Sequence, residues 1–466
     1  MSSKVNFNQI KKNIGLSVVA QVISLTVSFI MNLILPRYIS EYQYALWQTY
    51  LLYIGYVGIL HFGLLDGIVL RYSQYDYEEL DKKVIRSQFK CLLAMTSFFC
   101  MIGVICANIF CDSEMKPVFI MVAIGIITRT AFTYTSYSFQ ITNRIKCYAR
   151  MIIGYRLFYG ISVILLLALG VRDFYFFCFV DLCSDIFGVL FSVKQNKGMY
   201  FGSSLALQNT LEEAKKNIAA GVLLMLSNWS SFLLTGGARI IIQWHWDKLV
   251  FGKISFAFSL TNLFLTFVTA ISVVLFPSLK RTDKSTLPAL YEKIRNIINP
   301  FLIAILILYY PGCFILGQWL PGYKDSLKYL GVLLPIIVFS SKIGLLTNNY
   351  LKALRKEKHM LIINLISVVV ALLLFASSAY IINNLFLLLF FIVLAMMLCS
   401  ILSETVVMKE LGIFKTSNFL GEISMSLFFI FTTTINSPRI GCVAYGIAVL
   451  VYLIINRAKI REIVAH

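Results

Sequence analysis

The chain has 466 residues, of which 59% are hydrophobic and 14% are charged, and its mean hydropathy is +0.80. A soluble domain of this composition has too little polar surface to stay dissolved. The net charge of +19 lies mainly in short segments between long apolar runs, where it acts as a topology signal rather than as a surface for nucleic acid. The composition therefore indicates a polytopic membrane protein and excludes a soluble nucleic-acid-binding protein.

Long apolar runs recur along the whole chain, and each is long enough to cross about 30 Å of hydrocarbon as a helix. They predict an all-α polytopic membrane protein with about 14 transmembrane helices. The expected helices cover residues 14–35, 44–70, 89–110, 117–141, 150–170, 174–194, 217–240, 250–277, 296–317, 328–351, 360–382, 384–407, 421–436 and 440–456.

The lysines and arginines between these helices alternate between rich and poor connections. About 29 fall on one side of the membrane and about 7 on the other. Because the positive-rich connections of membrane proteins face the cytoplasm, we expect both termini on the cytoplasmic side of the cytoplasmic membrane. A missed or an extra helix would invert this alternation downstream, and no inversion occurs.

A short pattern occurs twice, about 200 residues apart. It begins with Lys11-Lys12-Asn13-Ile14 in one copy and with Lys215-Lys216-Asn217-Ile218 in the other, and an apolar run, an arginine and a second apolar run follow. About six helices separate the copies, so both copies start from the same side of the membrane, as in a parallel repeat. We expect two pseudo-symmetric six-helix bundles and a C-terminal helix pair. The expected segments are 1–210, 211–415 and 416–466.

Motifs for nucleotide hydrolysis or metal catalysis do not occur. The sequence contains neither the GxxxxGK[ST] phosphate loop nor the HExxH zinc motif. Its ten cysteines form no CxxC pair and lie mostly inside apolar runs, so we interpret them as packing residues. We therefore expect no catalytic residue, no metal and no cofactor.

Short segments at matching places in the two halves carry a family resemblance. They are Leu35–Trp47 and Gly63–Arg71 in the first half, and Trp246-Asp247, Phe251–Ser255 and Phe276–Arg281 in the second. These segments resemble the lipid-linked oligosaccharide (O-antigen type) flippases of the multidrug/oligosaccharidyl-lipid/polysaccharide exporter superfamily. The Leu-Gly and Tyr-Gly pairs usual in that family are replaced here by Ile39-Ser40 and Tyr44-Ala45.

The resemblance implies a V-shaped pair of lobes that exposes a central cavity to each side of the membrane in turn. The implied substrate is an oligosaccharide on a polyprenyl diphosphate, moved from the inner to the outer leaflet for surface polysaccharide biosynthesis. The expected partners are this lipid-linked sugar, membrane lipids, and the glycosyltransferases or polymerases of the same route.

Charged side chains inside the membrane are the candidate site residues, because a diphosphate and its sugars lose water without replacement in hydrocarbon. Arginine is well suited to phosphate oxygens, so a cationic cavity is the expected solution. The candidate cavity residues are Arg129, Arg156, Lys342, Arg239 and Arg37.

Several of these residues also have a purely structural interpretation. Arg129 and Arg156 would neutralise Asp181 and Asp185, which are four residues apart and share one helix face. Lys342 has no evident acidic partner on the neighbouring helices, which favours a role in substrate binding. Arg37 and Arg239 fall at the expected outer interface, where long basic side chains snorkel to water.

The expected cargo also suggests an energy source. A dianion that leaves a cell with a negative interior gains on the order of 4–5 kcal/mol at 100 mV. If a proton or sodium ion is exchanged as well, the candidate ion-coupling residues are Asp66, Asp181 and Asp185.

Three alternatives stay open at this stage. A multidrug antiporter of the same superfamily would favour unpaired carboxylates in the cavity, and the expected first and seventh helices contain no acid. A peptidoglycan-precursor flippase would carry several arginines on the first two helices, and none occurs between Ile14 and Leu35. A membrane glycosyltransferase or polymerase would need a sizeable outer loop, and the expected outer loops are short.

Overall fold

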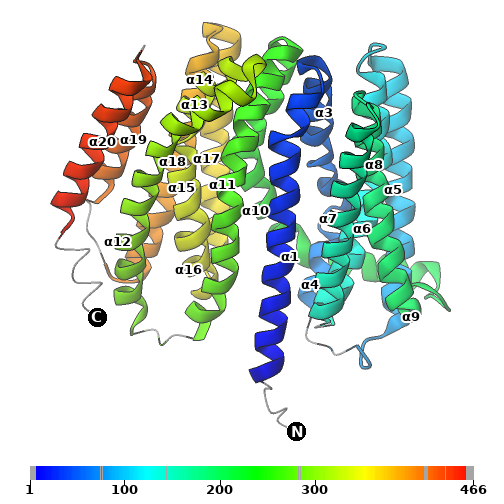
Figure 1. Ribbon diagram of the computed structural model, residues 1–466. Helices are drawn as coiled ribbons and strands as arrows, with labels where there is room; N and C mark the ends of the chain where they lie inside the picture. Colours follow the sequence, from blue (N-terminus) through cyan, green and yellow to red (C-terminus); the bar gives the residue numbers. More distant parts are fainter. Residues whose placement is uncertain are drawn as a thin grey trace. The chain divides into compact units, whose positions relative to one another are not determined.

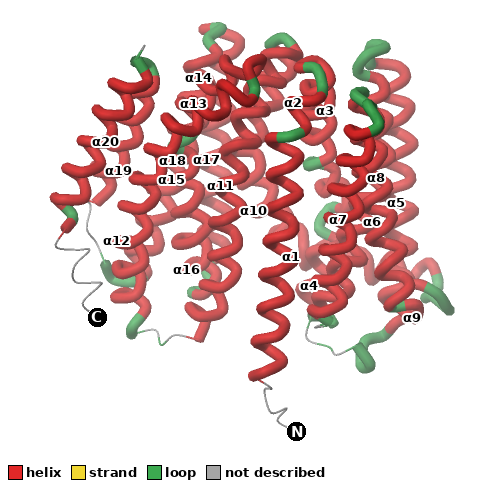
Figure 2. Tube along the Cα trace, viewed as in Figure 1, coloured by secondary structure: helices red, strands yellow, loops and turns green. Residues whose placement is uncertain are grey.

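The structure is a computed structural model that describes residues 7–73, 75, 77–142, 144–281, 283, 285–413, 418–435 and 437–457. These residues form helices joined by short loops and no β-strand (Figure 2). The chain divides into two compact units, Met1–Trp229 and Ser230–His466, and the division falls within the long helix α10 (Leu207–His245). The lobe boundaries expected at 210 and 415 stay a prediction, and the expected 416–466 segment extends beyond the described residues.

The first unit is built around α6, which packs against α5, α8 and the η1–α4 segment, while α1 packs against α7 (Figure 1). The first part of α10 completes this unit. Its other elements are α1 (Phe7–Leu33), α2 (Leu35–Tyr38), α3 (Glu41–Ile54), η1 (Val57–His61), α4 (Leu64–Tyr72), α5 (Lys82–Phe110), α6 (Lys116–Ile141), α7 (Ile145–Ala168), α8 (Phe174–Gln195) and α9 (Lys197–Tyr200).

The second unit begins with the last part of α10 and ends with α19 and α20, which pack side by side (Figure 1). Two of its segments, η4 and η5, are π-helical. Its elements after α10 are α11 (Lys248–Arg281), α12 (Leu287–Ile305), η2 (Leu306–Leu308), α13 (Tyr309–Trp319), η3 (Pro321–Tyr323), α14 (Lys324–Leu333), α15 (Ile336–Ser341), η4 (Lys342–Thr347), α16 (Asn348–Ala353), α17 (Glu357–Ala376), η5 (Ser377–Ile382), α18 (Leu385–Glu410), α19 (Asn418–Thr433) and α20 (Pro438–Ile455).

The predicted fold class is confirmed: the protein is an all-α, multi-pass membrane protein with two helical bundles. Within the described residues, 11 helices are long and apolar enough to cross a membrane, or up to 13 if each of two bent pairs counts as one span. Phe419–Thr433 is an apolar helix shorter than these. It accounts for the difference from the 14 expected spans, because a helix needs about 20 residues to cross the hydrocarbon.

Two expected helices are broken. The expected helix 44–70 bends by 59° between His61 and Leu64, where Phe62 and Gly63 adopt left-handed backbone conformations. The expected helix 328–351 bends by 52° between Leu333 and Ile336. Pro335 lies at that break and has no backbone N–H to continue the helical hydrogen bonds.

Backbones of α4 and α10 approach each other unusually closely in the first unit. A Cβ atom on Gly67 would overlap the carbonyl oxygen of Asn217, and one on Gly221 would overlap the carbonyl oxygen of Gly63. Beside this contact, the Arg71 guanidinium donates hydrogen bonds to Glu213 and Asn217, both at 2.5 Å. Small residues let membrane helices pack backbone to backbone. Here this close packing brings Arg71 of α4 within hydrogen-bond distance of Glu213 on α10.

We expect Gly67→Ala and Gly221→Ala each to lower the free energy of unfolding by about 1–3 kcal/mol, the usual cost of overpacking a filled interface. Thermal unfolding of the purified protein in detergent measures the effect. Gly58→Ala is the matched control, because a Cβ at Gly58 meets no atom within 4 Å. Equal stability of all three variants would contradict the close approach.

Candidate functional site

The first unit contains a buried charge cluster that joins α6 to α8. Arg129 Nη2 lies 2.5 Å from Asp181 Oδ2, and Arg129 Nη1 lies 3.2 Å from Asp185 Oδ1. The hydroxyl of Tyr50 on α3 donates to Asp181 at 2.8 Å, and that of Thr128 donates to Asp185 at 3.3 Å. The predicted pairing of Arg129 with both acids is therefore confirmed. Its side chain stays 26% exposed.

Arg156 does not join this cluster through an ion pair. It is half-buried on α7, and its guanidinium carbon lies 5.2 Å from the centre of the Tyr155 ring. It forms no ion pair with any residue that the structure describes. Arg156 therefore does not neutralise Asp181 and Asp185 by direct contact, although its charge acts on Asp185 from a distance.

The remaining two candidate arginines lie on helices α2 and α10: Arg37 is in the last turn of α2, and Arg239 is in the last third of α10. Arg37 is exposed on the short helix α2. Arg239, in the second unit, is half-buried and donates a hydrogen bond of 3.2 Å to Ser255 Oγ on α11. Its guanidinium also lies over the rings of Phe251 and Phe258, at 5.8 and 5.6 Å. These contacts hold α10 against α11.

Asp66 is the one candidate acid that lacks a salt bridge among the described residues. It lies in the first turn of α4, just after the helix break, and its exposed fraction is 8%. His61, at the other side of the break, accepts a hydrogen bond of 3.1 Å from the backbone N–H of Gly63. A buried carboxyl group of this kind, inside a membrane, is a candidate for exchanging a proton.

The second unit contains a larger buried charge cluster, and it includes Lys342. Lys342 Nζ lies 2.5 Å from Glu404 Oε2 and also contacts Glu422. Arg295 Nη2 lies 2.8 Å from Glu422 Oε1, and Arg295 Nε contacts Glu404. Asn299 donates a further hydrogen bond of 2.5 Å to Glu422. None of the four charged side chains is more than 7% exposed.

The expectation that Lys342 lacks an acidic partner is therefore wrong. The physical reason is that two glutamates project from α18 and α19 toward the same point, and two cations from α12 and η4 meet them. Sequence reasoning missed Arg295 because the third helix of this unit begins at Leu287, not near residue 296. The signal that was available is the presence of Glu404 and Glu422 inside apolar runs.

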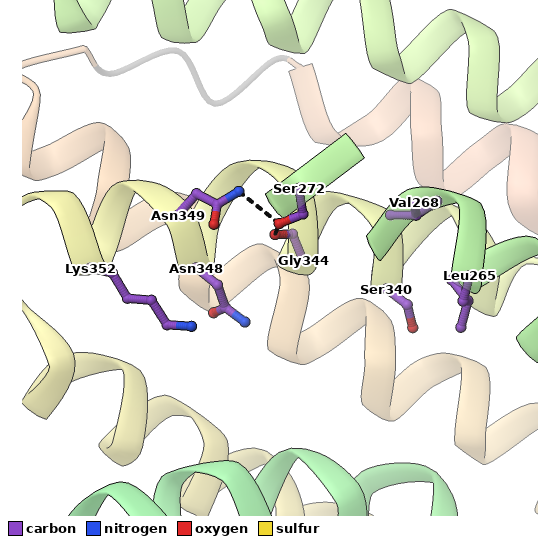
Figure 3. A pocket seen from close by; sticks show the side chains of 8 residues that line it. All are labelled: Leu265, Val268, Ser272, Ser340, Gly344, Asn348, Asn349 and Lys352. Carbon is purple, nitrogen blue, oxygen red and sulfur yellow. Dashed lines mark hydrogen bonds between the residues drawn. The ribbon is translucent and has the colours of Figure 1, made fainter. Parts of the chain in front are cut away.

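A cavity of about 300 Å³ lies between α11 and the α15–η4–α16 segment (Figure 3). Its walls combine apolar side chains of α11 with hydroxyl, amide and ammonium groups, and no lining residue is acidic. The lining residues are Leu265, Val268, Ser272, Ser340, Gly344, Asn348, Asn349 and Lys352. Sequence reasoning did not single out Lys352 as a site residue, because it falls at the expected cytoplasmic end of its helix.

We expect Lys342→Met to destabilise the protein by about 3–5 kcal/mol, because it leaves two buried glutamates with one cation. The double variant Lys342→Met, Glu422→Gln removes one charge of each sign and should recover part of this loss. Thermal unfolding and the yield of folded protein measure both effects, with the exposed Lys358→Met as control. A Lys342→Met protein as stable as the wild type would contradict the cluster.

Comparison with known proteins gives matches only at the level of structure. No protein-family model and no curated protein matches the sequence. The lipid II flippase MurJ in an inward closed conformation superposes with a TM-score of 0.68 and 13% identity, covering 96% of this chain and 98% of MurJ.

Two multidrug transporters give similar results over a shorter part of the chain. An inward-facing MATE family transporter of the MOP superfamily has a TM-score of 0.63 and 14% identity, covering 84% of this chain and 98% of its own. A MATE transporter in a bent conformation has a TM-score of 0.56 and 15% identity, covering 90% and 97%. At these identities the comparison shows the fold, and the chain therefore has the two-bundle fold of MOP superfamily transporters.

Proposed function

We propose that the protein is a flippase that translocates a polyprenyl-diphosphate-linked oligosaccharide from the inner to the outer leaflet of the cytoplasmic membrane by alternating access. Both termini then face the cytoplasm. The cargo is made and consumed by glycosyltransferases or polymerases of surface polysaccharide biosynthesis, which are the partners of this proposal.

The observation that carries the proposal is that two basic side chains of the bundles, Arg156 and Lys352, lack an ion pair, whereas most buried acids have one. Asp181 and Asp185 are held by Arg129, and Glu404 and Glu422 are held by two cations. The cations Arg156 and Lys352, in contrast, form no ion pair with any described residue. These two cations outnumber Asp66, the buried acid that lacks an ion pair among the described residues, and their charge attracts an anionic head group and repels an organic cation.

The extent of the shared fold supports a lipid cargo. The similarity to MurJ extends over 96% of the chain, whereas the similarity to the MATE transporters extends over 84–90%. The chain also carries α19 and α20 beyond its six-helix repeat, and Glu422 on α19 is part of the buried charge cluster. The helix pair is thus an integral part of the second unit. This agrees with a similarity to MurJ that extends over 96% of the chain.

In this proposal the membrane potential drives transport in place of ATP. A head group with two negative charges gains about 2.3 kcal/mol per charge for each 100 mV when it moves toward the positive side. Asp66 is the candidate for a coupled proton, because it is the buried carboxylate without an ion pair among the described residues.

A peptidoglycan-precursor flippase is the second candidate, and the MurJ-like fold is the observation that favours it. The helix α1 nevertheless contains no arginine, while the family resemblance of Leu35–Trp47 and Gly63–Arg71 is to flippases of oligosaccharide lipids. The two candidates share the diphosphate and differ in the attached sugar or peptide.

Reconstituted vesicles test the proposal. We expect the purified protein to move a fluorescent polyprenyl-diphosphate oligosaccharide between leaflets, as measured with a membrane-impermeant quencher, and to move it faster toward a positive potential. A peptidoglycan-precursor lipid and an organic cation dye serve as competing cargoes. Equal rates in protein-free vesicles, or transport of the dye alone, would contradict the proposal.

Removal of the unpaired arginine tests the charge argument. We expect Arg156→Ala to slow translocation roughly tenfold or more, because a hydrogen bond to a charged group contributes about 1.5–3 kcal/mol. Arg156→Lys keeps the charge and should recover part of the rate. Arg150→Ala changes an exposed arginine on the same helix and should transport like the wild type. Unchanged transport by Arg156→Ala at normal stability would exclude this residue from the cargo path.

A further inference from the structure

We infer that the cavity between α11 and the α15–η4–α16 segment is a subsite for a glycosyl phosphate, in which Lys352 binds the phosphate and Asn348 binds a sugar hydroxyl. The inference rests on the proposed function and names the part of the cargo that this cavity would hold. Its volume of about 300 Å³ is at the lower end for ligand sites and fits one sugar phosphate rather than a whole oligosaccharide.

The polar residues of the cavity follow a regular spacing. Ser340, Gly344, Asn348 and Lys352 are four residues apart, so they lie along one face of a continuous helical segment. Figure 3 shows the side chains of Ser340, Asn348 and Lys352 extending in the same direction from that face. The spacing places an ammonium, an amide and a hydroxyl in a row about three turns long.

One part of the cavity wall is fixed by internal hydrogen bonds. Asn349 donates to Ser272 Oγ at 2.9 Å and to the carbonyl oxygen of Leu345 at 2.8 Å. Ser272 donates in turn to the carbonyl oxygen of Gly344 at 2.9 Å (Figure 3). These bonds hold α11 against η4, so the wall is formed before any ligand arrives.

Two other lining residues, Lys352 and Asn348, carry polar groups that lack such partners. The Lys352 side chain is exposed and forms no ion pair with any residue in the described ranges. Asn348 Oδ1 is buried, and no hydrogen-bond donor contacts it among the described residues. An ammonium without a carboxylate attracts a phosphate oxygen, and a buried amide oxygen without a donor accepts a hydroxyl. A sugar phosphate supplies both groups on one molecule.

The backbone beside the cavity is irregular in the way that membrane transport sites often are. The segment follows a 52° break at Pro335, and residues Lys342–Thr347 form a π-helix. Discontinuous helices supply the binding sites of many transporters, and π-helical turns are frequent at functional sites. Gly344 lies inside the π-helix and offers open space, since a Cβ there meets no atom within 4 Å.

Direct binding to the full-length protein in nanodiscs of zwitterionic lipid tests the inference. The probes are inorganic pyrophosphate, farnesyl diphosphate and its glucosyl conjugate, measured by titration calorimetry. We expect the glucosyl conjugate to bind tightest, Lys352→Ala to weaken all three probes at least tenfold, and Lys352→Arg to retain most of the affinity. Asn348→Leu should weaken the glucosyl conjugate at least tenfold and pyrophosphate much less. Lys358→Ala is the matched control for the charge.

Steric filling gives a test that does not depend on charge. Gly344→Phe should abolish binding of the glucosyl conjugate, because the ring enters the cavity without a Cβ clash. Gly312→Phe, at another glycine whose Cβ position is open, is the matched control and should bind normally. Thermal unfolding of each variant confirms that it is folded.

The outcomes separate this inference from the proposed function. Loss of binding in Lys352→Ala and Gly344→Phe supports the subsite, even if the wild type fails to translocate the cargo in vesicles. If the wild type translocates the cargo, and both variants bind and transport it normally, the subsite proposal is overturned. The flippase proposal then still stands. In a last arm, the zwitterionic lipid of the nanodiscs is replaced by anionic phospholipid. If this weakens the binding of all three probes equally, and the glucosyl conjugate is not preferred, the cavity binds the head groups of bulk lipid, and the subsite proposal is overturned.

Discussion

Pairing of charges inside a low-dielectric interior is the constraint on which the rest of this structure depends. An isolated ion in hydrocarbon is costly, so a bundle that contains Arg129, Asp181 and Asp185, or Arg295, Lys342, Glu404 and Glu422, must bring these side chains together. Each ion pair joins helices that are far apart in sequence. The second cluster joins residues 295 to 422, and it therefore fixes the register of four helices at one point.

The same constraint explains why α19 belongs to the second unit. Glu422 would be an uncompensated charge if α19 left the bundle, so its pairs with Arg295 and Lys342 hold α19 to the other helices of the second unit. Neutral contacts continue the interface away from the charges: Tyr310 donates to Thr432 Oγ1 at 2.8 Å, and Tyr445 on α20 donates to the carbonyl oxygen of Ile303 at 2.9 Å. Ion pairs of Glu422 and hydrogen bonds of Tyr310 and Tyr445 thus hold α19 and α20 to the second unit at different positions along the helices.

The all-helical, membrane-spanning architecture could be predicted from the sequence, because hydropathy depends on each residue's own chemistry. The face shared by Asp181 and Asp185 followed from helical spacing alone. The partners of Lys342 could not be predicted in the same way, because four helices that are separate in sequence meet there. Hydropathy falls at charged residues, so the sequence predicted Arg295 in the loop before a helix that starts near residue 296. In the structure, α12 already begins at Leu287 and includes Arg295. The breaks near Gly63 and Pro335 were likewise hidden within long apolar runs.

The two faces of the α15–η4–α16 segment connect the buried cluster to the cavity. Lys342 opens the π-helix and is held by Glu404 and Glu422, while Gly344, two residues later, lines the cavity and accepts a hydrogen bond from Ser272. A π-helical turn has one more residue than an α-helical turn between its hydrogen bonds, so converting one into the other rotates the residues beyond it. Such a conversion would move Asn348 and Lys352 relative to Lys342, which the ion pairs keep in place. The ion pairs of Lys342 thus hold one end of the π-helix in place, and the cavity residues Asn348 and Lys352 take their positions relative to that end.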